Sequence, residues 1–223
     1  MSIHCAVRAS LPYHPIIAVL FVQTISPDRQ GHRKVRPATS MALLDGSDFE
    51  GAVAEFEQAV RLEPESVEFQ KNLAVTYLAA GRLPEAEGAF SEAIRLEPND
   101  FFAHFGRGIL RLTTGDLIAA EHELTTSLDL NSSFPATHFY LGNLRGQTGD
   151  IDAAVLHFQE AIRLDPSYTD ALNDLAMAHL WRGEFEIAVS QAQNSLAIDP
   201  NSADAYSVLS MAYSRLGQFD RAE

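Results

Sequence analysis

The sequence has almost no cysteine: Cys5 is the single cysteine among 223 residues. One cysteine excludes a disulfide within the chain, and it also excludes the Cys-x-x-Cys pairs of common zinc sites. Long apolar runs are missing as well. The most apolar stretch, Ile16–Ile25, covers ten residues, whereas a membrane-spanning helix needs about twenty. We therefore expect neither a disulfide nor a stable membrane span.

Basic residues are scarce. The chain has 16 Lys and Arg against 30 Asp and Glu, which gives a formal net charge of −14. The imbalance lies in residues 41–223, with 11 basic and 29 acidic residues, whereas residues 1–40 have five basic residues and one acid. Such acidity argues against nucleic-acid binding, which needs clustered Lys and Arg. Two interpretations stay open: a solvated exterior that favours solubility, or a surface for a basic partner.

What the sequence does contain is a repeat of 34 residues. The segment AEGAFSEAIRLEPND at 86–100 nearly recurs as AVLHFQEAIRLDPSY at 154–168, with eight of fifteen letters identical. The offset of 68 residues is twice 34. Stepping by 34 gives columns of one residue type, and such a fixed period predicts a repeat array. The two clearest columns are Ala52, Ala86, Ala120, Ala154, Ala188 and Ala222, and Gly81, Gly115, Gly149, Gly183 and Gly217.

Each repeat is predicted to fold as two short antiparallel helices, which makes the fold class all-α. Between Pro64 and Gly81 the sequence is rich in helix formers, with apolar residues three and four positions apart. Gly81 is expected to end that helix, because glycine adopts the left-handed conformation at little cost. Pro84 suits the first turn of a second helix, and Pro98 ends it. Columns of small residues are expected where helix backbones approach closely.

At this point the sequence resembles the tetratricopeptide repeat family. The resemblance implies a right-handed α-solenoid of stacked helix pairs, in which the first helix of each pair lines a concave groove. Members of the family usually bind a peptide or partner protein in that groove. The repeats would cover about 41–66, 67–100, 101–134, 135–168 and 169–202, with a partial repeat at 203–223.

Catalytic, metal and cofactor motifs are missing. His104 and His138 occupy equivalent positions of adjacent repeats, so about one helix-pair spacing separates them, and ligands of one zinc ion must converge to about 2 Å from it. There is no His-Glu-x-x-His motif and no nucleophile elbow. Gly106 and Gly108 fall within a predicted helix rather than in a phosphate-binding loop after a strand. We expect no enzymatic activity, no metal and no cofactor.

The face of the first helices is the predicted binding site, as the resemblance implies. Two known binding modes of the family do not fit. Val75 and Gly106 stand where a carboxylate clamp needs asparagine, and the column of Asn72 continues with Gly106 and Tyr140, so no asparagine ladder forms. What remains is an aromatic and Met-rich stripe with polar neighbours. The predicted groove residues are Lys71, Asn72, Phe102, Phe105, Ile109, Phe139, Tyr140, Asn143, Asn173, Met177 and Trp181.

Two interpretations of this stripe are open. The side chains could be exposed, forming a pocket for an apolar peptide or an amphipathic helix. Alternatively, some rings pack on neighbouring helices and leave nothing exposed. The third repeat favours a rotated helix, because Arg107 and Arg111 occupy its usual packing columns and resist burial. Such a rotation would bury Phe105 and Ile109 and free the arginines.

The predicted function is a non-enzymatic scaffold that binds a protein or peptide partner in the groove of the repeat array. The alternative is the substrate-presenting helical arm of a larger modular enzyme, such as a protein glycosyltransferase, with the catalytic domain outside this chain. An aromatic and Met-rich groove is typical of interaction surfaces, whereas nothing in the sequence identifies the partner.

The two ends do not follow the repeat. Residues 1–40 have three interpretations: a poorly ordered leader, an export signal, or an extra docked strand or helix. We expect a cytoplasmic protein, or an exported one if residues 1–25 act as a signal. At the other end the sixth repeat stops six residues after Gly217. Its uncovered apolar edge could pair with a second copy and form a homo-oligomer.

Overall fold

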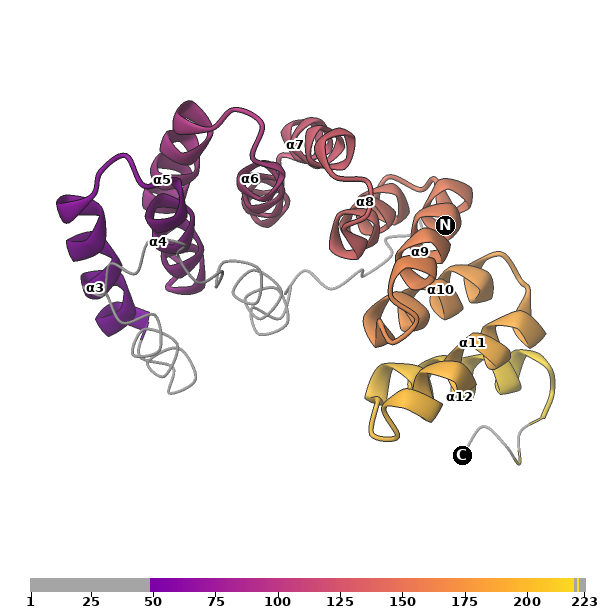
Figure 1. The fold of residues 1–223 in the computed structure, drawn as a ribbon. Coiled ribbons are helices and arrows are strands. Elements are labelled where there is room, and N and C mark those ends of the chain that lie inside the picture. The colour runs from indigo at the N-terminus through magenta and orange to yellow at the C-terminus, as the bar shows by residue number, and fades with distance from the viewer. Residues whose placement is uncertain (1–48, 219, 221–223) are drawn as a thin grey trace. The chain divides into compact units, whose positions relative to one another are not determined.

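The computed structural model describes residues 49–218 and residue 220, and in this part of the chain it contains helices and no strand (Figure 1). The predicted leader, residues 1–40, lies outside the described residues. The all-α repeat array predicted from the sequence is confirmed. Its helices are α3 (Phe49–Leu62), α4 (Val67–Ala79), α5 (Leu83–Leu96), α6 (Phe101–Thr114), α7 (Leu117–Leu130), α8 (Pro135–Gln147), α9 (Ile151–Leu164), α10 (Thr169–Trp181), α11 (Phe185–Ile198) and α12 (Ala203–Arg215).

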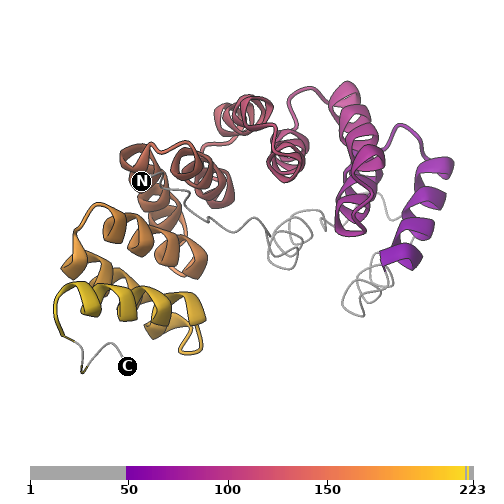
Figure 2. The same cartoon turned by 180° about the vertical axis from the view of Figure 1, so that it is seen from behind.

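The chain divides into two compact units, with the boundary between Leu130 and Asn131. In the first unit α4 packs against α5 and α6 packs against α7, while α3 packs on α4. In the second unit the pairs are α8 with α9 and α10 with α11, and α12 packs on α10 and α11. Both views show these neighbours side by side within each unit (Figure 1, Figure 2). Each unit is therefore a stack of helix pairs.

A polar residue with a short side chain precedes several of the helices and caps their first turn. Asp100 precedes α6, and its Oδ1 atom accepts a hydrogen bond of 2.7 Å from the backbone N–H of Ala103. Asp150 does the same for α9 through the N–H of Ala153, at 3.1 Å. Such caps satisfy N–H groups that have no partner within the helix. The starts of these helices are therefore fixed by the residue immediately before them.

Glycines end the first helix of each pair, as the sequence predicted. Gly115 has a φ of 79° and follows α6, where its N–H donates to the carbonyl oxygen of Leu112 at 3.1 Å. A residue with a side chain adopts this left-handed backbone at a cost, whereas glycine does not. The same conformation recurs at every position of the column, at Gly81, Gly115, Gly149, Gly183 and Gly217.

Small residues lie where two helices of a pair touch. A methyl group at Gly108 on α6 would come within 2.8 Å of the Leu124 side chain on α7. A methyl group at Gly142 on α8 would come within 2.6 Å of the Phe158 ring on α9. The alanine column is buried as well, from Ala52 to Ala188. The core of each unit is therefore a layer between helices, in which large side chains fill the space beside small ones.

Candidate partner-binding surface

Many of the predicted groove residues are buried. Phe105 and Ile109 on α6 are fully buried, and Phe102 and Tyr140 are 3% exposed. At these four positions the interpretation of an exposed stripe is wrong. The side chains pack in the interior, as the second interpretation predicted. The burial does not come from a rotation of α6. Val75, the equivalent of Ile109 on α4, is fully buried as well, and Gly108 meets Leu124 on α7 as the equivalent Gly142 meets Phe158 on α9. Asn72 and Asn173 are also buried, and Phe139 is 9% exposed.

Three of the predicted residues connect one first helix to the next. Each contacts the residue that comes 29 positions later and immediately precedes the next first helix. The contact is an ion pair in one repeat, a contact between tilted aromatic rings in another and a hydrogen bond in a third. These side chains therefore hold consecutive repeats together. The pairs are Lys71 Nζ with Asp100 Oδ2 at 2.6 Å, the rings of Phe139 and Tyr168 with centroids 5.0 Å apart, and Asn173 Nδ2 with Ser202 Oγ at 3.1 Å.

The exposed apolar side chains of the first helices gather in the second unit. Trp181 at the end of α10 is 43% exposed, and Met211 on α12 is 40% exposed. Met177 lies one turn before Trp181 and is half-buried, with part of its side chain packed on the core around α10, α11 and α12. We call Met177, Trp181 and Met211 the Met–Trp surface. Because α10 and α12 pack against each other, these residues belong to neighbouring helices.

Met211 was missed in the sequence, although a signal for it was present. Asn143, Met177 and Met211 stand 34 residues apart and so occupy one column, on α8, α10 and α12. Asn143 and Met177 are half-buried, and Met211 is exposed. Extending the column of Met177 by one repeat would have found Met211.

Acidic residues lie beside the Met–Trp surface on α10 and α12. Asp170 and Asp174 lie one turn apart on α10, and Met177 and Trp181 follow along the same stripe of the helix. Asp204 occupies the equivalent position of Asp170 on α12. Burial raises the pKa of the Tyr140 hydroxyl on α8, and the charges of Asp170 and Asp174 raise it further. The face therefore combines apolar side chains with negative charge.

Comparison with known sequences identifies the repeat. Models of the tetratricopeptide repeat match residues 38–101, 105–169 and 139–203, and a second model of this repeat matches residues 192–223. The chain belongs to the tetratricopeptide repeat family. A comparison with curated proteins finds no match.

Solved structures with the tetratricopeptide fold agree with this assignment. YrrB, described as a TPR protein with an unusual peptide-binding site, is 20% identical over 77% of this chain and 88% of YrrB, with a TM-score of 0.63. MamA is 20% identical over 80% of this chain and 99% of MamA, with a TM-score of 0.62. The pilF protein of Pseudomonas aeruginosa is 15% identical over 83% of this chain and 84% of pilF, with a TM-score of 0.74. At these identities the likeness concerns the fold alone.

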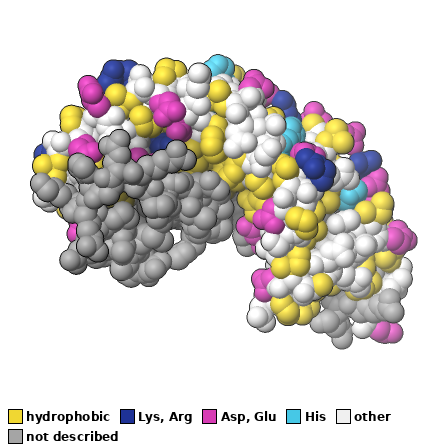
Figure 3. Space-filling model, viewed as in Figure 1, with side chains coloured by type: hydrophobic (Ala, Val, Ile, Leu, Met, Phe, Trp, Pro, Cys, Tyr) yellow, Lys and Arg dark blue, Asp and Glu magenta, His cyan; other side chains and the backbone are white. Residues whose placement is uncertain are grey.

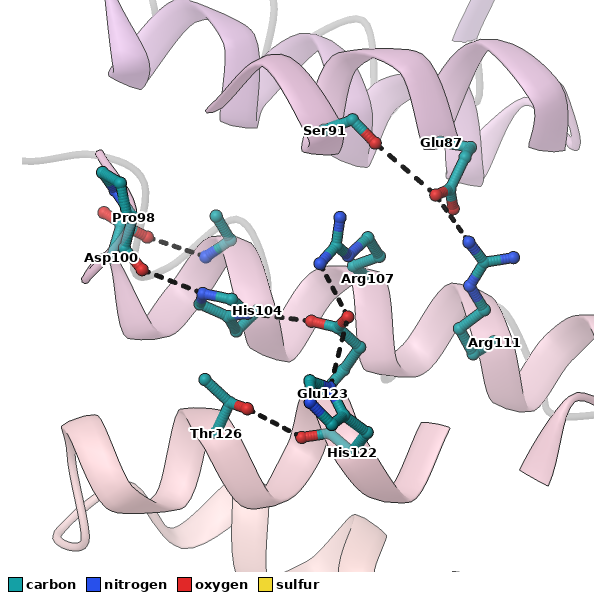
Figure 4. Close-up of polar contacts among 11 residues, drawn as sticks. Glu87, Ser91, Pro98, Asp100, His104, Arg107, Arg111, His122, Glu123 and Thr126 are labelled. Atoms are coloured by element: carbon teal, nitrogen blue, oxygen red, sulfur yellow. Dashed lines mark hydrogen bonds and ion pairs between the residues drawn. The ribbon is translucent and has the colours of Figure 1, made fainter. Parts of the chain in front are cut away.

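The tetratricopeptide array also has a polar cluster between its helices. Glu123 on α7 accepts hydrogen bonds from His104 Nδ1 at 2.8 Å and from Arg107 Nη2 at 2.6 Å (Figure 4). Arg111 pairs with Glu87 on α5, with its Nη2 2.6 Å from Oε1. Sequence reasoning predicted that the rotation of α6 would free both arginines. They are instead paired with carboxylates of the two neighbouring second helices.

Both ring nitrogens of His104 face acceptors, since Nε2 lies 3.0 Å from the carbonyl oxygen of Pro98. The hydrogen bond to Glu123 raises the pKa of His104, although burial opposes this. Burial alone would raise the pKa of Glu123, but the hydrogen bonds and charges of His104 and Arg107 outweigh it and lower that pKa. The cluster is therefore a hydrogen-bonded triad of His104, Arg107 and Glu123, held between α6 and α7.

The next repeat has two histidines at the equivalent positions. His138 on α8 and His157 on α9 place their Nδ1 atoms 3.4 Å apart. Burial lowers the pKa of His157, and the charges of His138 and Arg145 lower it further. Among residues 49–218, no group of three or more His, Cys, Asp or Glu side chains is arranged to hold a metal ion. Nor does any helix in this range have the length and apolar character needed to cross a membrane.

Proposed function

We propose that this chain is a non-enzymatic scaffold that binds a partner polypeptide on the Met–Trp surface. Tetratricopeptide repeat proteins are protein-interaction scaffolds, and the family membership supports that general role. The observation that carries the specific proposal is the exposure of Trp181 and Met211 on one face of the second unit. Large aromatic and thioether side chains supply contact area and tend to anchor interfaces.

The chemistry of the partner follows from the charge around this surface. Asp170, Asp174 and Asp204 lie on the same helices as the apolar side chains, and the chain carries almost twice as many acidic as basic residues. Acidic side chains are spread over the visible surface of the described residues (Figure 3). A segment with apolar residues flanked by Lys or Arg would complement this surface in both properties. The peptide-binding site described for YrrB offers a precedent on the same fold, at 20% identity.

Affinity capture with matched variants tests the proposal. The full chain and the double variant Trp181→Ala/Met211→Ala would each serve as bait, and quantitative mass spectrometry would compare the captured proteins. We expect at least one specific partner whose capture falls about 30-fold in the variant, which corresponds to about 2 kcal/mol for a loss of anchor residues. Thermal unfolding of both baits would show that the variant is folded.

The control is a double variant on the second helices. Leu156 on α9 is 67% exposed and Ile187 on α11 is 45% exposed, so Leu156→Ala/Ile187→Ala removes similar apolar area from another face. This control should retain the partner. If the Met–Trp variant captures the same partners as the wild type, or if the control loses them equally, the proposed surface is wrong.

A further inference from the structure

The facing histidines of the fourth repeat form a contact that the scaffold role does not use. His138 on α8 is 8% exposed, and His157 on α9 is half-buried. Their ring centroids are 5.7 Å apart and their Nδ1 atoms are 3.4 Å apart, so the rings meet through these two nitrogens. This geometry is that of an N–H···N hydrogen bond between the two helices of the repeat.

The direction of this hydrogen bond follows from the other nitrogen of His138. Nε2 lies 3.3 Å from the carbonyl oxygen of Ser132, and because a carbonyl oxygen only accepts, Nε2 carries a proton. A neutral imidazole has one N–H group, which leaves Nδ1 of His138 as the acceptor. Nδ1 of His157 is therefore the donor, and Nε2 of His157 is the nitrogen that can take up a further proton.

The contact can hold one added proton but not two. A proton on Nε2 of His157 leaves its Nδ1–H group donating to His138. A second proton has to bind Nδ1 of His138, which would set two N–H groups against each other across 3.4 Å and two positive charges side by side. In the unfolded chain both imidazoles protonate independently, each with a pKa of about 6.5. Acid therefore favours the unfolded form of this contact.

The preceding repeat responds in the opposite way at the equivalent positions. Glu123 stands where the fourth repeat has His157, and it accepts a hydrogen bond from His104 at 2.8 Å. A protonated imidazole gains a carboxylate partner there. In the fourth repeat it meets a second imidazole instead. The residue type at one position of the second helix therefore sets the sign of the response to acid.

Charged groups of both helices act on the pair. Burial lowers the pKa of His157, and the charges of His138 and of Arg145 on α8 lower it further. On α9 the hydrogen bond from Arg163 at 2.6 Å lowers the pKa of Glu160, and the charge of His138 lowers it further. The carboxylate of Glu160 is thus already paired with a guanidinium, which limits its support for a second proton on the histidines.

Helix α10 also packs on α9, and its ionisable side chains have other partners. Asp170 and Asp174 act on the hydroxyl of Tyr140. His179 places its Nδ1 atom 2.5 Å from a carboxylate oxygen of Glu184. The response of the fourth repeat to acid is therefore decided within the pair of α8 and α9.

We propose that the His138–His157 contact is an acid-sensitive joint of the fourth repeat, which holds α8 against α9 near neutral pH and weakens as the medium becomes acidic. The folded form binds one proton fewer than the unfolded form, so the stabilisation present above about pH 6.5 is lost as the pH falls below it. Because α10 packs on α9 and carries Met177 and Trp181, the joint lies beside the helix that forms part of the Met–Trp surface. The response itself does not depend on what that surface binds.

Hydrogen exchange of the full chain at about pH 7.5 and about pH 5.5 tests this response. Exchange rates of the amides in α8 and α9, corrected for the intrinsic rate at each pH, give the equilibrium constant for local opening. His157→Gln introduces the residue found at the equivalent position 191, and His138→Gln introduces the residue found at position 70. Glutamine can keep each hydrogen bond but does not titrate. His122→Gln, at a histidine on α7 whose side chain is 77% exposed, is the matched control.

The measured quantity is the ratio of the opening constant at about pH 5.5 to that at about pH 7.5. We expect this ratio to be about tenfold larger in the wild type than in either glutamine variant of the pair, because one histidine with a usual pKa of about 6.5 stays neutral in the folded form. His157→Glu recreates the carboxylate of the third repeat and should lower the ratio below that of His157→Gln. His122→Gln should match the wild type within about twofold.

Thermal unfolding at neutral pH would show that each variant is folded. The proposal is overturned if His157→Gln and His138→Gln keep the wild-type ratio, since the opening of α8 and α9 would then not depend on the pair. It is also overturned if His122→Gln reduces the ratio as much as they do, because the response would then belong to histidines in general.

Discussion

Single residues decide how polar the interior of the array is. Glu123 and His104 are buried between α6 and α7, and Arg107 is mostly buried beside them. Taking charges out of water costs free energy, which the pairing offsets through short hydrogen bonds. The sequence shows an arginine in a packing column, but its partner comes from another helix sixteen residues later. The local sequence pattern therefore shows that Arg107 occupies a packing position, but it does not show that Glu123 pairs with it.

The His104–Glu123 pair predicts a pH dependence of stability. The folded pKa of His104 is raised above its usual 6.5, so its contribution is present below about pH 6.5 and is lost as the pH rises through the folded pKa. The folded pKa of Glu123 is lowered below 4.5, so its contribution is present above about pH 4.5 and is lost as the pH falls through the folded pKa. The pair should therefore stabilise the folded protein most between about pH 4.5 and about pH 6.5.

His104→Gln tests this dependence. Glutamine at 104 reproduces the residue of the equivalent position 70 and can keep the bond to the loop carbonyl. The variant should be less stable than the wild type at about pH 5.5, and the difference should shrink toward about pH 9, because the wild-type imidazolium deprotonates. Urea unfolding across this range measures the difference. Two parallel curves of unfolding free energy against pH would rule out a charged His104 in the folded protein.

At the scale of helices, the sequence predicts local features well. The starts and ends of α4 and α6 follow from Pro64, Gly81, Pro98 and Gly115, because proline and glycine act on the backbone of their own segment. The pairing of helices follows from the 34-residue columns. What the sequence does not predict is which side chains of other helices pair with a buried polar residue.

Helix α6 illustrates that limit. Arg107 and Arg111 lie in packing columns of α6, and the carboxylates that pair with them lie on α7 and α5. Those contacts join residues far apart in the sequence, so they cannot be read from the helix itself. Asn173, a predicted groove residue, likewise has a distant partner, because its side chain donates a hydrogen bond to Ser202 before α12.

The link between first helices leads to a prediction for Asp100. Its Oδ1 atom caps α6 and its Oδ2 atom pairs with Lys71, whose side chain is 13% exposed. Asp100→Ala removes both interactions and should lower the free energy of unfolding by about 2–3 kcal/mol. Ser66→Ala removes a cap of α4 alone, a hydrogen bond of 3.3 Å, and should cost about 1 kcal/mol.

Asp100→Asn separates the two roles. Asparagine can still cap the helix, but it loses the charge that pairs with Lys71. Its unfolding free energy in urea should lie between those of Asp100→Ala and the wild type. Equal costs for Asp100→Ala and Ser66→Ala would show that the pair with Lys71 adds nothing to the link between α4 and α6.

At the scale of the whole molecule, stability is distributed over contacts between neighbouring helices. Within each compact unit a helix packs on the helices next to it in the chain or one further along. The stability of such an array is approximately a sum of repeat terms and nearest-neighbour terms. A local change should therefore alter local opening more than opening at a distance.

A pair of glycine variants tests this distribution. Gly142→Ala on α8 places a methyl group within 2.6 Å of the Phe158 ring, so it should destabilise the fourth repeat by about 1–3 kcal/mol. Gly88→Ala on α5 meets no atom within 4 Å and should stabilise its helix by about 0.5–1 kcal/mol.

In Gly142→Ala, hydrogen exchange should accelerate at the amides of α8, α9 and α10 and stay unchanged in α3, α4 and α5. Gly88→Ala should slow exchange in α5 and leave α8 and α9 unaffected. Equal acceleration of all protected amides in Gly142→Ala would mean that the chain opens as one cooperative unit, contrary to the additive description of its repeats.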